Sequence, residues 1–244
     1  MAQEIQEDSG GWLAIVATPI GNLEDITLRA LRTLQEADTI CAEDTRRTRI
    51  LLDKYDIRKK LESYHIFNEH GRTPDLIDRI RKGEKLVLVS DAGTPCIADP
   101  GFYLIRAAAE AGIEPRIIPG VSALTFAISG SALPSDRFAF YGFLPVKSGR
   151  RGAALARIAA EDKTCVIFES PFRLEKLIRE IAEVIGSETR IAIVREATKV
   201  HEQILRGTAA ELLAKTAGTK WKGECVVVLH PSHDDESADA EDEQ

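Results

Sequence analysis

The 244-residue sequence contains no apolar run that approaches the roughly 20 residues needed to span a bilayer. Its first residues, with Glu4, Glu7 and Asp8, are acidic and lack the hydrophobic segment of a secretory signal peptide. An apolar fraction of 44% is typical of a globular protein. We therefore expect a cytoplasmic protein with no membrane partner.

Cysteine is scarce, and the sequence contains no C-x-x-C pair. His65 and His70 have no ligand-like spacing with each other or with any cysteine. We therefore expect no metal site and no disulfide, but thiols in a reducing compartment, most of them buried in strands. The four cysteines are Cys41, Cys96, Cys165 and Cys225.

Two nucleotide-binding fingerprints are also absent, G-x-G-x-x-G and G-x-x-x-x-G-K-[ST]. Their absence disfavours a dinucleotide-dependent dehydrogenase and a P-loop NTPase. Any ligand loop in this chain must therefore have another pattern.

Positive charge is missing from the end of the chain, where residues 232–244 carry seven acids and no Lys or Arg. These acids account for the whole net charge of −7. We expect a disordered, solubilising tail there and a disordered N-terminal segment at 1–11. The body between them is mildly basic, which is compatible with an anionic partner.

Strand-like apolar runs alternate with helical periodicity along the whole body, which predicts an α/β fold of two lobes with mainly parallel sheets flanked by helices. Because ten strands are many for one sheet, we expect a break near Pro119-Gly120, giving an N-terminal lobe at 12–120 and a C-terminal lobe at 121–231. The predicted strands are 12–17, 38–42, 61–65, 85–89, 115–118, 137–143, 163–168, 190–195, 202–206 and 224–230. The predicted helices are 26–36, 44–54, 73–82, 101–112, 121–132, 150–161, 171–185 and 208–217.

Two loops of small residues follow predicted strands in the first lobe: Ser90–Gly101, which contains Asp91, and Thr18–Thr27. Small residues let ligands approach the backbone, and the carboxyl ends of strands are where open α/β sheets bind ligands. An ordinary strand-to-helix turn explains the same composition equally well.

Four further segments carry groups suited to binding or catalysis, and each also has a purely structural explanation. Gly120 and Ser122 could expose backbone groups and a hydroxyl to a ligand, or they could form a hinge between the two lobes. Residues 42–49 contain two carboxylates followed by three arginines, and the arginines could bind phosphates. Alternatively, the carboxylates cap a helix whose arginines face solvent. Residues 64–70 combine polar groups that could act in general-base catalysis. Alternatively, these groups form hydrogen bonds within an ordinary loop. Residues 140–151 join aromatics to cations, as on single-stranded RNA surfaces, or form a solvated loop.

Taken in order, these segments resemble the tetrapyrrole-methylase superfamily, and within it the ribosomal RNA small subunit methyltransferase I family. The corrin and siroheme methylases differ from this chain in the first loop, where they carry Gly-Asp-Pro. Val121 departs from the Pro more usual after Pro-Gly in the family. The matching pieces are Thr18-Pro-Ile-Gly-Asn-Leu23, Ala42-Glu-Asp-Thr-Arg46, Asn68-Glu69, Ser90-Asp-Ala-Gly-Thr-Pro95, Asp99-Pro-Gly101, Leu133-Pro-Ser-Asp-Arg137, Gly142-Phe-Leu-Pro145, Arg195-Glu196, Thr198-Lys199 and Lys222-Gly-Glu224.

The resemblance implies S-adenosylmethionine-dependent 2′-O-methylation of a cytidine in the decoding region of small-subunit (16S) rRNA. It also implies a tetrapyrrole-methylase-like fold with the cofactor in the interlobe cleft, and a homodimer that acts on rRNA within the small ribosomal subunit. The residues expected to line the cofactor are Pro19, Asp91, Ala92, Gly93, Thr94, Ile97, Ala98, Ser122, Phe143 and Ala197.

The proton acceptor is expected among Glu69, Asp44 and Lys199, the last only if burial lowers its pKa. RNA phosphates are expected on Arg46, Arg47, Lys147, Arg150 and Arg151. Two other readings remain open. A small-molecule methylase would act on a tetrapyrrole, and a catalytically silent RNA-binding or assembly protein would bind no cofactor.

Overall fold

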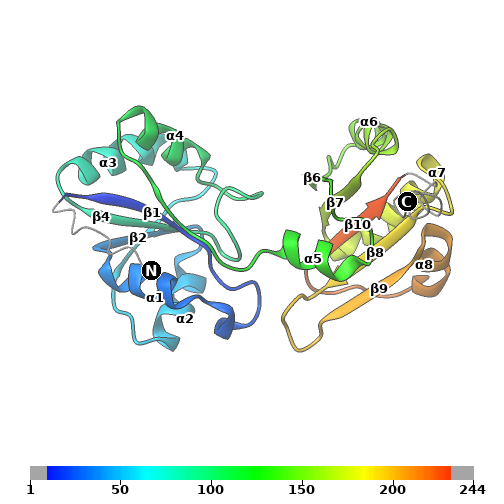
Figure 1. Ribbon diagram of the computed structural model, residues 1–244, viewed down its shortest axis with the longest axis horizontal. Coiled ribbons are helices and arrows are strands. Elements are labelled where there is room, and N and C mark those ends of the chain that lie inside the picture. Colours follow the sequence, from blue (N-terminus) through cyan, green and yellow to red (C-terminus); the bar gives the residue numbers. More distant parts are fainter. Residues whose placement is uncertain (1–9, 232–244) are drawn as a thin grey trace, which may run out of the picture. The chain divides into compact units, whose positions relative to one another are not determined.

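The computed structural model describes residues 10–231, and the chain divides between Ser122 and Ala123 into two compact units. The acidic tail at 232–244 and residues 1–9 of the predicted N-terminal segment lie outside the described residues. Figure 1 labels most of the helices and strands of both units.

The first unit contains a five-stranded sheet in the order β3-β2-β4-β1-β5, and every pair of neighbouring strands is parallel. A sheet that is covered on both faces needs strands that are apolar throughout. The sequence Trp-Leu-Ala-Ile-Val of β1 meets this need, because all five residues are buried. The strands are β1 (Trp12–Val16), β2 (Thr39–Ala42), β3 (Lys60–Ser63), β4 (Lys85–Val89) and β5 (Arg116–Ile118).

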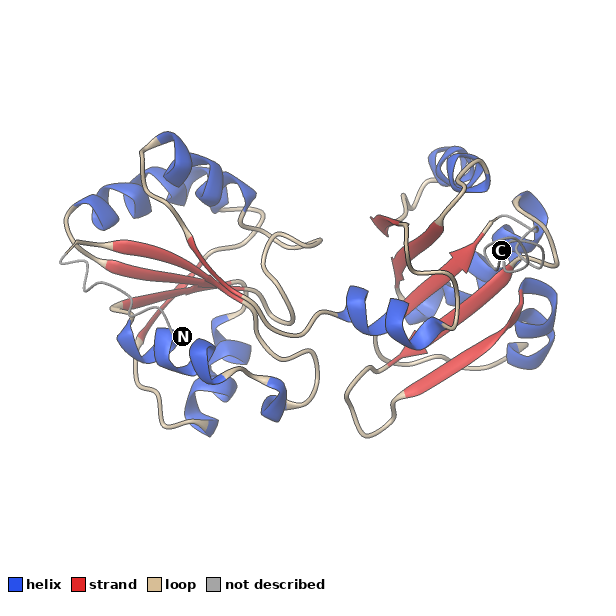
Figure 2. Cartoon of the chain, viewed as in Figure 1, coloured by secondary structure: helices blue, strands red, loops and turns tan. Residues whose placement is uncertain are grey.

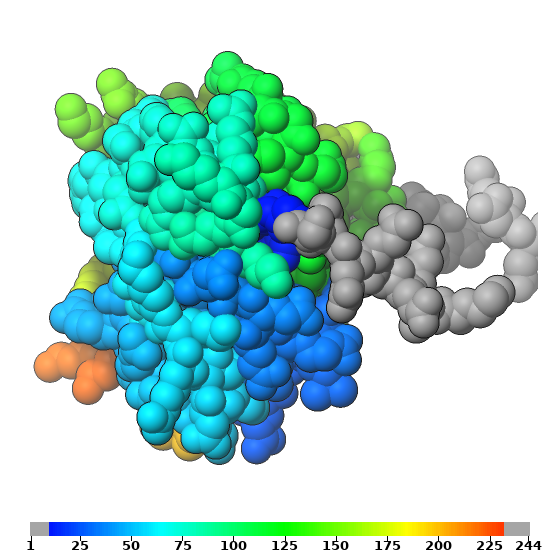
Figure 3. Space-filling model, turned by 90° about the vertical axis from the view of Figure 1, so that its left-hand side faces the viewer, coloured from blue at the N-terminus to red at the C-terminus, as the bar shows by residue number. Residues whose placement is uncertain are grey.

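Two helix layers cover the faces of this sheet. Leu34 and Leu52 belong to the core on one face, and Leu76 and Leu104 belong to the core on the other. In Figure 3, which faces the amino ends of the strands, the start of β1 (dark blue) lies between the two layers. The first layer holds α1 (Leu28–Glu36) and α2 (Thr45–Lys54), and the second holds α3 (Glu69–Arg81) and α4 (Phe102–Glu110); a short 3-10 helix, η1 (Leu23–Asp25), precedes α1.

The neighbouring strands β1 and β4 form a topological switch point. The chain leaves β1 for α1 on one face of the sheet and leaves β4 for α4 on the other face. Open α/β sheets bind ligands at the carboxyl edge beside such a switch point, so we expect a ligand crevice between these two loops.

The second unit contains a mixed sheet in the order β6-β7-β10-β8-β9. Only β6 and β7 are parallel, and the other three pairs are antiparallel. Figure 2 shows β8 and β9 running in opposite directions. The strands are β6 (Phe138–Phe143), β7 (Thr164–Glu169), β8 (Arg190–Arg195), β9 (Gln203–Thr208) and β10 (Cys225–His230). The predicted α/β fold class is confirmed, with a fully parallel first sheet and a mixed second one.

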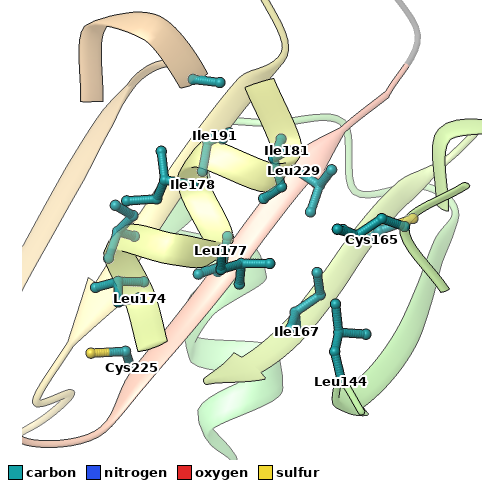
Figure 4. Packing of buried hydrophobic residues seen from close by; sticks show 14 of the residues in the cluster. Leu144, Cys165, Ile167, Leu174, Leu177, Ile178, Ile181, Ile191, Cys225 and Leu229 are labelled. Carbon is teal, nitrogen blue, oxygen red and sulfur yellow. The ribbon is translucent and has the colours of Figure 1, made fainter. Parts of the chain in front are cut away.

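Helices α6, α7 and α8 cover one face of this second sheet and α5 covers the other. Figure 4 shows Leu174, Leu177, Ile178 and Ile181 of α7 packed with Ile191 of β8 in this core. The helical elements are α5 (Ala123–Ser131), α6 (Ser148–Ala159), η2 (Pro171–Arg173), α7 (Leu174–Val184) and α8 (Ala209–Thr216).

Candidate functional site

The two small-residue loops of the first unit are tied together at the switch point. The backbone nitrogen of Thr18 donates to the carbonyl of Gly93 at 2.8 Å, and the nitrogen of Gly93 donates to the carbonyl of Thr18 at 3.0 Å. The Thr18 hydroxyl also donates to the carbonyl of Ser90 at 3.2 Å. The loops after β1 and β4 therefore form one crevice wall rather than two independent turns.

The second loop holds a strained backbone. Cys96 and Ala98 lie in the left-handed region, with φ of 74° and 66°, a conformation that costs non-glycine residues of order 1–3 kcal/mol. Gly101 closes the loop at φ 139°, and a Cβ there would lie 2.6 Å from the Cys96 sulfur. Such strain is concentrated at ligand-binding segments in proteins, so it supports a binding role for this loop.

Asp91 joins the loop after β4 to the end of β2. Its Oδ1 accepts a hydrogen bond from the backbone nitrogen of Asp44 at 2.8 Å, and its Oδ2 lies 3.6 Å from Nε of Arg47. The Asp91 side chain remains partly exposed. The carboxylate that the sequence predicts for a ligand hydroxyl or amine is therefore fixed in place and still accessible.

Glu43, directly after β2 and beside Asp91, is a further candidate that was not among the predicted site residues. Burial and then the charge of Asp91 raise the pKa of its carboxyl, outweighing Arg47 and a hydrogen bond from the Asp91 backbone. A carboxylate with a raised pKa in a ligand crevice is a stronger base and is typical of functional sites. Its position directly after the buried strand β2 is the signal that could have identified it.

The predicted cofactor residues of the first unit, apart from Ser122, belong to the loops that follow β1 and β4. Pro19 and Gly93 are buried beside the backbone tie, and Ile97 is 38% exposed at the tip of the strained loop. The others are partly or fully exposed: Asp91, Ala92, Thr94, Ala98 and, at the end of the unit, Ser122.

Asp44 and Glu69, two of the predicted bases, are both held by other groups. Asp44 caps α2 and accepts hydrogen bonds from the Arg46 side chain and backbone, which lower its pKa to about 2. That makes Asp44 a weak base. Glu69 is only 5% exposed, and its Oε2 accepts from the nitrogen of Gly101 at 3.4 Å. Burial separates Glu69 from a substrate in solution.

Lys199, the third predicted base, does not meet the condition set for it. Its ammonium lies 2.8 Å from Glu196 Oε1 and 3.0 Å from Glu224 Oε2. Burial lowers its pKa, but hydrogen bonds to Glu196 and Glu224 outweigh burial, and the net effect raises the pKa. Lys199 therefore lacks the lowered pKa on which its predicted role as a base depends.

The predicted cofactor residues of the second unit, Phe143 and Ala197, both lie where strands of its sheet end. Phe143 is the last residue of β6 and is 57% exposed. Ala197 follows β8 between Glu196 and Thr198, which have φ of 51° and 64°. This loop is strained like the loop of the first unit.

The prediction that Arg151 contacts RNA from a flexible loop is wrong. Arg151 belongs to α6 and is 2% exposed, with Nη2 2.8 Å from Glu169 Oε2 and Nε bonded to Glu180. Arg151 lies on the buried face of the amphipathic helix α6, in its first turn. Lys147 and Arg150 of the same segment are exposed, as are Arg46 and Arg47 in the first unit.

Within residues 10–231, no three His, Cys, Asp or Glu side chains gather as metal ligands. Cys41, Cys165 and Cys225 are buried free thiols, and Cys96 is partly exposed. None of the described helices combines the length and the apolar character needed to cross a membrane.

A family model for Tetrapyrrole (Corrin/Porphyrin) Methylases matches residues 13–213. The chain is 47% identical over 219 residues to the ribosomal RNA small subunit methyltransferase I of Thermotoga maritima, covering 90% of this chain and 98% of that protein. It is 44% identical over 225 residues to the protein of the same name from Escherichia coli O157:H7, covering 91% of this chain and 79% of that one.

Solved structures with low sequence identity share the fold. A diphthine synthase superposes with a TM-score of 0.72 at 19% identity, covering 90% of each chain. A uroporphyrin-III C-methyltransferase from Thermus thermophilus in complex with S-adenosylhomocysteine gives 0.64 at 18% identity, covering 90% of this chain and 97% of that one. At these identities, the likeness concerns the fold.

Proposed function

We propose that this chain, which belongs to the ribosomal RNA small subunit methyltransferase I family of tetrapyrrole methylases, 2′-O-methylates a cytidine in the decoding region of 16S rRNA. The methyl donor is S-adenosylmethionine, and the substrate is rRNA within the small ribosomal subunit. The names of relatives at 42–47% identity support the rRNA substrate. The cytidine, its 2′-oxygen and the decoding region come from the family resemblance. A cytoplasmic homodimer belongs to the same proposal.

The observation that carries the proposal within this chain is the tied pair of loops at the switch point. Beside this tie lie the partly exposed carboxylate of Asp91 and the apolar, exposed Ile97. These groups suit a ligand with a sugar or amine donor, an apolar base and a positive charge. S-adenosylmethionine has all three, and when bound it supplies an electrophilic methyl carbon on a sulfonium.

In the transfer, a bond forms between the ribose 2′-oxygen and the methyl carbon while the bond from carbon to sulfur breaks. Positioning of the two reactants supplies most of the acceleration, since effective molarities of about 10⁵–10⁸ M are available to well-oriented groups. The hydroxyl proton passes to a base or to water. We assign the proton to Glu43, whose raised pKa suits this role better than the lowered pKa of Asp44.

Exposed cations of each unit are proposed to hold the RNA. Arg46 and Arg47 lie on α2 beside the crevice, and Lys147 and Arg150 lie at the start of α6. Arginine in particular forms bidentate hydrogen bonds with phosphate oxygens.

The test is methylation in vitro with the purified chain, labelled S-adenosylmethionine and small subunits from a strain lacking this enzyme. The proposal expects label on one cytidine ribose, located by mass spectrometry, and none on uroporphyrinogen. Label on the tetrapyrrole instead would overturn it in favour of a small-molecule methylase. Calorimetry that showed no binding of S-adenosylhomocysteine would favour a catalytically silent RNA-binding or assembly protein.

A further inference from the structure

The second sheet brings four loops of the chain to one edge. The register pairs Phe143 with Phe168, and Glu169 with Cys225, which in turn faces Arg195. Residues 144–147, 170–173, 196–202 and 222–224 therefore leave or enter neighbouring strands along a single line. At about 4.8 Å between strands, the line from β6 to β8 is about 15 Å long.

Apolar side chains on these loops are unusually exposed. Phe172 is 92% exposed, Val200 96% and Val146 75%. Among the large hydrophobic side chains within residues 10–231, Phe67, at 94%, and Leu28, at 75%, are the comparably exposed ones of the first unit. Because the side chain of Phe172 is almost fully exposed just after β7, it contributes little to the packing of this unit.

Cations lie between these apolar groups. Lys147, Arg150 and Lys222 are exposed, and none of them forms an ion pair with another residue in the described part of the chain. They come from three different loops or helix starts, so their positive charges are spread along the edge.

The acids of the same edge are largely neutralised by other residues. Glu169 is buried and pairs with Arg151 and Arg173, at 2.8 and 2.7 Å. Glu196 and Glu224 share the ammonium of Lys199. Glu202 also lies on this edge, exposed, and its carboxylate accepts from the backbone nitrogen of Thr198. The three cations Lys147, Arg150 and Lys222 still give the edge an excess of positive charge.

We propose that this edge is a platform for single-stranded RNA. The ring of Phe172 stacks on a base, and Lys147, Arg150 and Lys222 hold the phosphates on either side of it. Aromatic rings interleaved with unpaired cations are the combination by which proteins bind single strands without reading sequence. Because Phe143 and Ala197 lie on this same edge, the platform would carry the strand past the residues predicted to contact the methyl donor. The inference rests on the proposed function, because it assigns the substrate of that function to a surface.

Charge complementarity favours RNA over a second copy of this chain as the occupant. A protein partner would need to bring acids to three separate positions around one phenylalanine, whereas an RNA strand has a phosphate beside every base. RNA therefore matches the spacing of cations around Phe172 without any special sequence.

The test measures binding of a fluorescent, unstructured oligocytidylate RNA to the full chain by anisotropy. Removing a stacking ring typically weakens such binding by about 5- to 150-fold, so Phe172→Ala should fall in this range and Phe172→Trp should restore affinity. Phe138→Ala is the matched control, an exposed phenylalanine at the opposite end of β6, and should bind as the unmodified chain does.

The cations are tested by the salt dependence of the same binding. Each phosphate contact to a single strand contributes about 0.7 to the slope of log affinity against log salt. Replacing Lys147, Arg150 and Lys222 together by Ala should flatten the slope by up to about 2, whereas Lys82→Ala, an exposed lysine at the end of α3, should leave it unchanged.

Equal RNA affinity of Phe172→Ala and the unmodified chain would overturn the proposal. So would a change in sedimentation with unchanged RNA binding, because that result assigns the edge to a second copy of the chain. Binding of S-adenosylhomocysteine and methylation of small subunits are measured separately on the unmodified chain. Their failure would remove the proposed function, whereas loss of oligonucleotide binding in Phe172→Ala alone concerns the platform.

Discussion

The carboxylate of Glu69 accepts a hydrogen bond from the backbone nitrogen of Gly101 across 3.4 Å of buried space. Glu69 is the first residue of α3, and Gly101 caps α4 at the end of the strained loop. A carboxylate at a helix N-terminus is also stabilised by the helix dipole. Glu69 therefore holds the end of the strained loop that follows β4.

Glu69→Gln should keep the single-turnover methylation rate within about threefold, because the amide oxygen still accepts from Gly101. Glu69→Ala should lower cofactor affinity and the free energy of unfolding, since it frees the loop. A loss of 10²-fold or more in Glu69→Gln, with both affinities unchanged, would instead restore Glu69 as the general base.

Asp91→Asn should keep the fold, because its amide oxygen can still accept from the nitrogen of Asp44. It should weaken binding of S-adenosylhomocysteine by about 10-fold or more, since hydrogen bonds to a charged acceptor are worth about 1.5–3 kcal/mol. Calorimetry measures the affinity, and Asp75→Asn, an exposed carboxylate on α3, is the control. Unchanged affinity in Asp91→Asn would remove Asp91 from the cofactor site.

Glu43→Gln should slow single-turnover methylation by about 10²–10⁴-fold if Glu43 accepts the proton. In the unmodified chain the rate should rise with pH as this carboxyl loses its proton. The midpoint should lie above the ordinary 4.5, because burial and Asp91 raise the pKa of Glu43. A wild-type rate in Glu43→Gln would assign the proton to water.

Arg151→Ala should destabilise the second unit by about 3 kcal/mol, because it leaves Glu180 and part of Glu169 without their buried partner. Arg150→Ala, one residue earlier and exposed, should change the free energy of unfolding by less than about 0.5 kcal/mol. Urea denaturation of the two variants compares them directly. Equal stability would contradict the buried position of Arg151.

Glu62 should make the first unit sensitive to acid. Hydrogen bonds from Arg79, with Lys60 and Arg72, lower the pKa of Glu62 to about 2 from 4.5. A lowered carboxyl pKa stabilises the fold above 4.5, and this contribution, at most about 3 kcal/mol, is lost as the pH falls from 4.5 toward 2. Glu62→Gln should therefore be less stable than the unmodified chain at neutral pH, and the gap should close in acid. A constant gap across this range would refute the assignment.

Hydrophobic pattern alone predicted each strand and helix of the body, including β4 at Lys85–Val89. It did not predict that β10 runs antiparallel between β7 and β8, because both parallel and antiparallel central strands are apolar throughout. The direction of a strand depends on how the chain connects it to the rest of the sheet. The residues of the strand itself carry no signal for that connection.

Individual side chains escaped prediction for a different reason. The start of α3 was expected at residue 73, near Pro74, but the helix begins at Glu69, which carries that carboxylate into the interior. The predicted helix at 150–161 already contained Arg151, but the pattern did not show that the helix buries Arg151 while it leaves Arg150 exposed. A charge next to a strand end is equally compatible with solvent, core or ligand until the partner strands are known.

The tie between Thr18 and Gly93 consists of main-chain atoms only, so it does not depend on which side chain position 18 carries, provided that it is not proline, which has no N–H to donate. Gly93 is the constrained partner, because its φ of 79° strains any residue with a Cβ. The side chain at position 18 can therefore be varied in a laboratory evolution experiment while the bridge that fixes the spacing of the two loops stays in place, as long as Gly93 is kept.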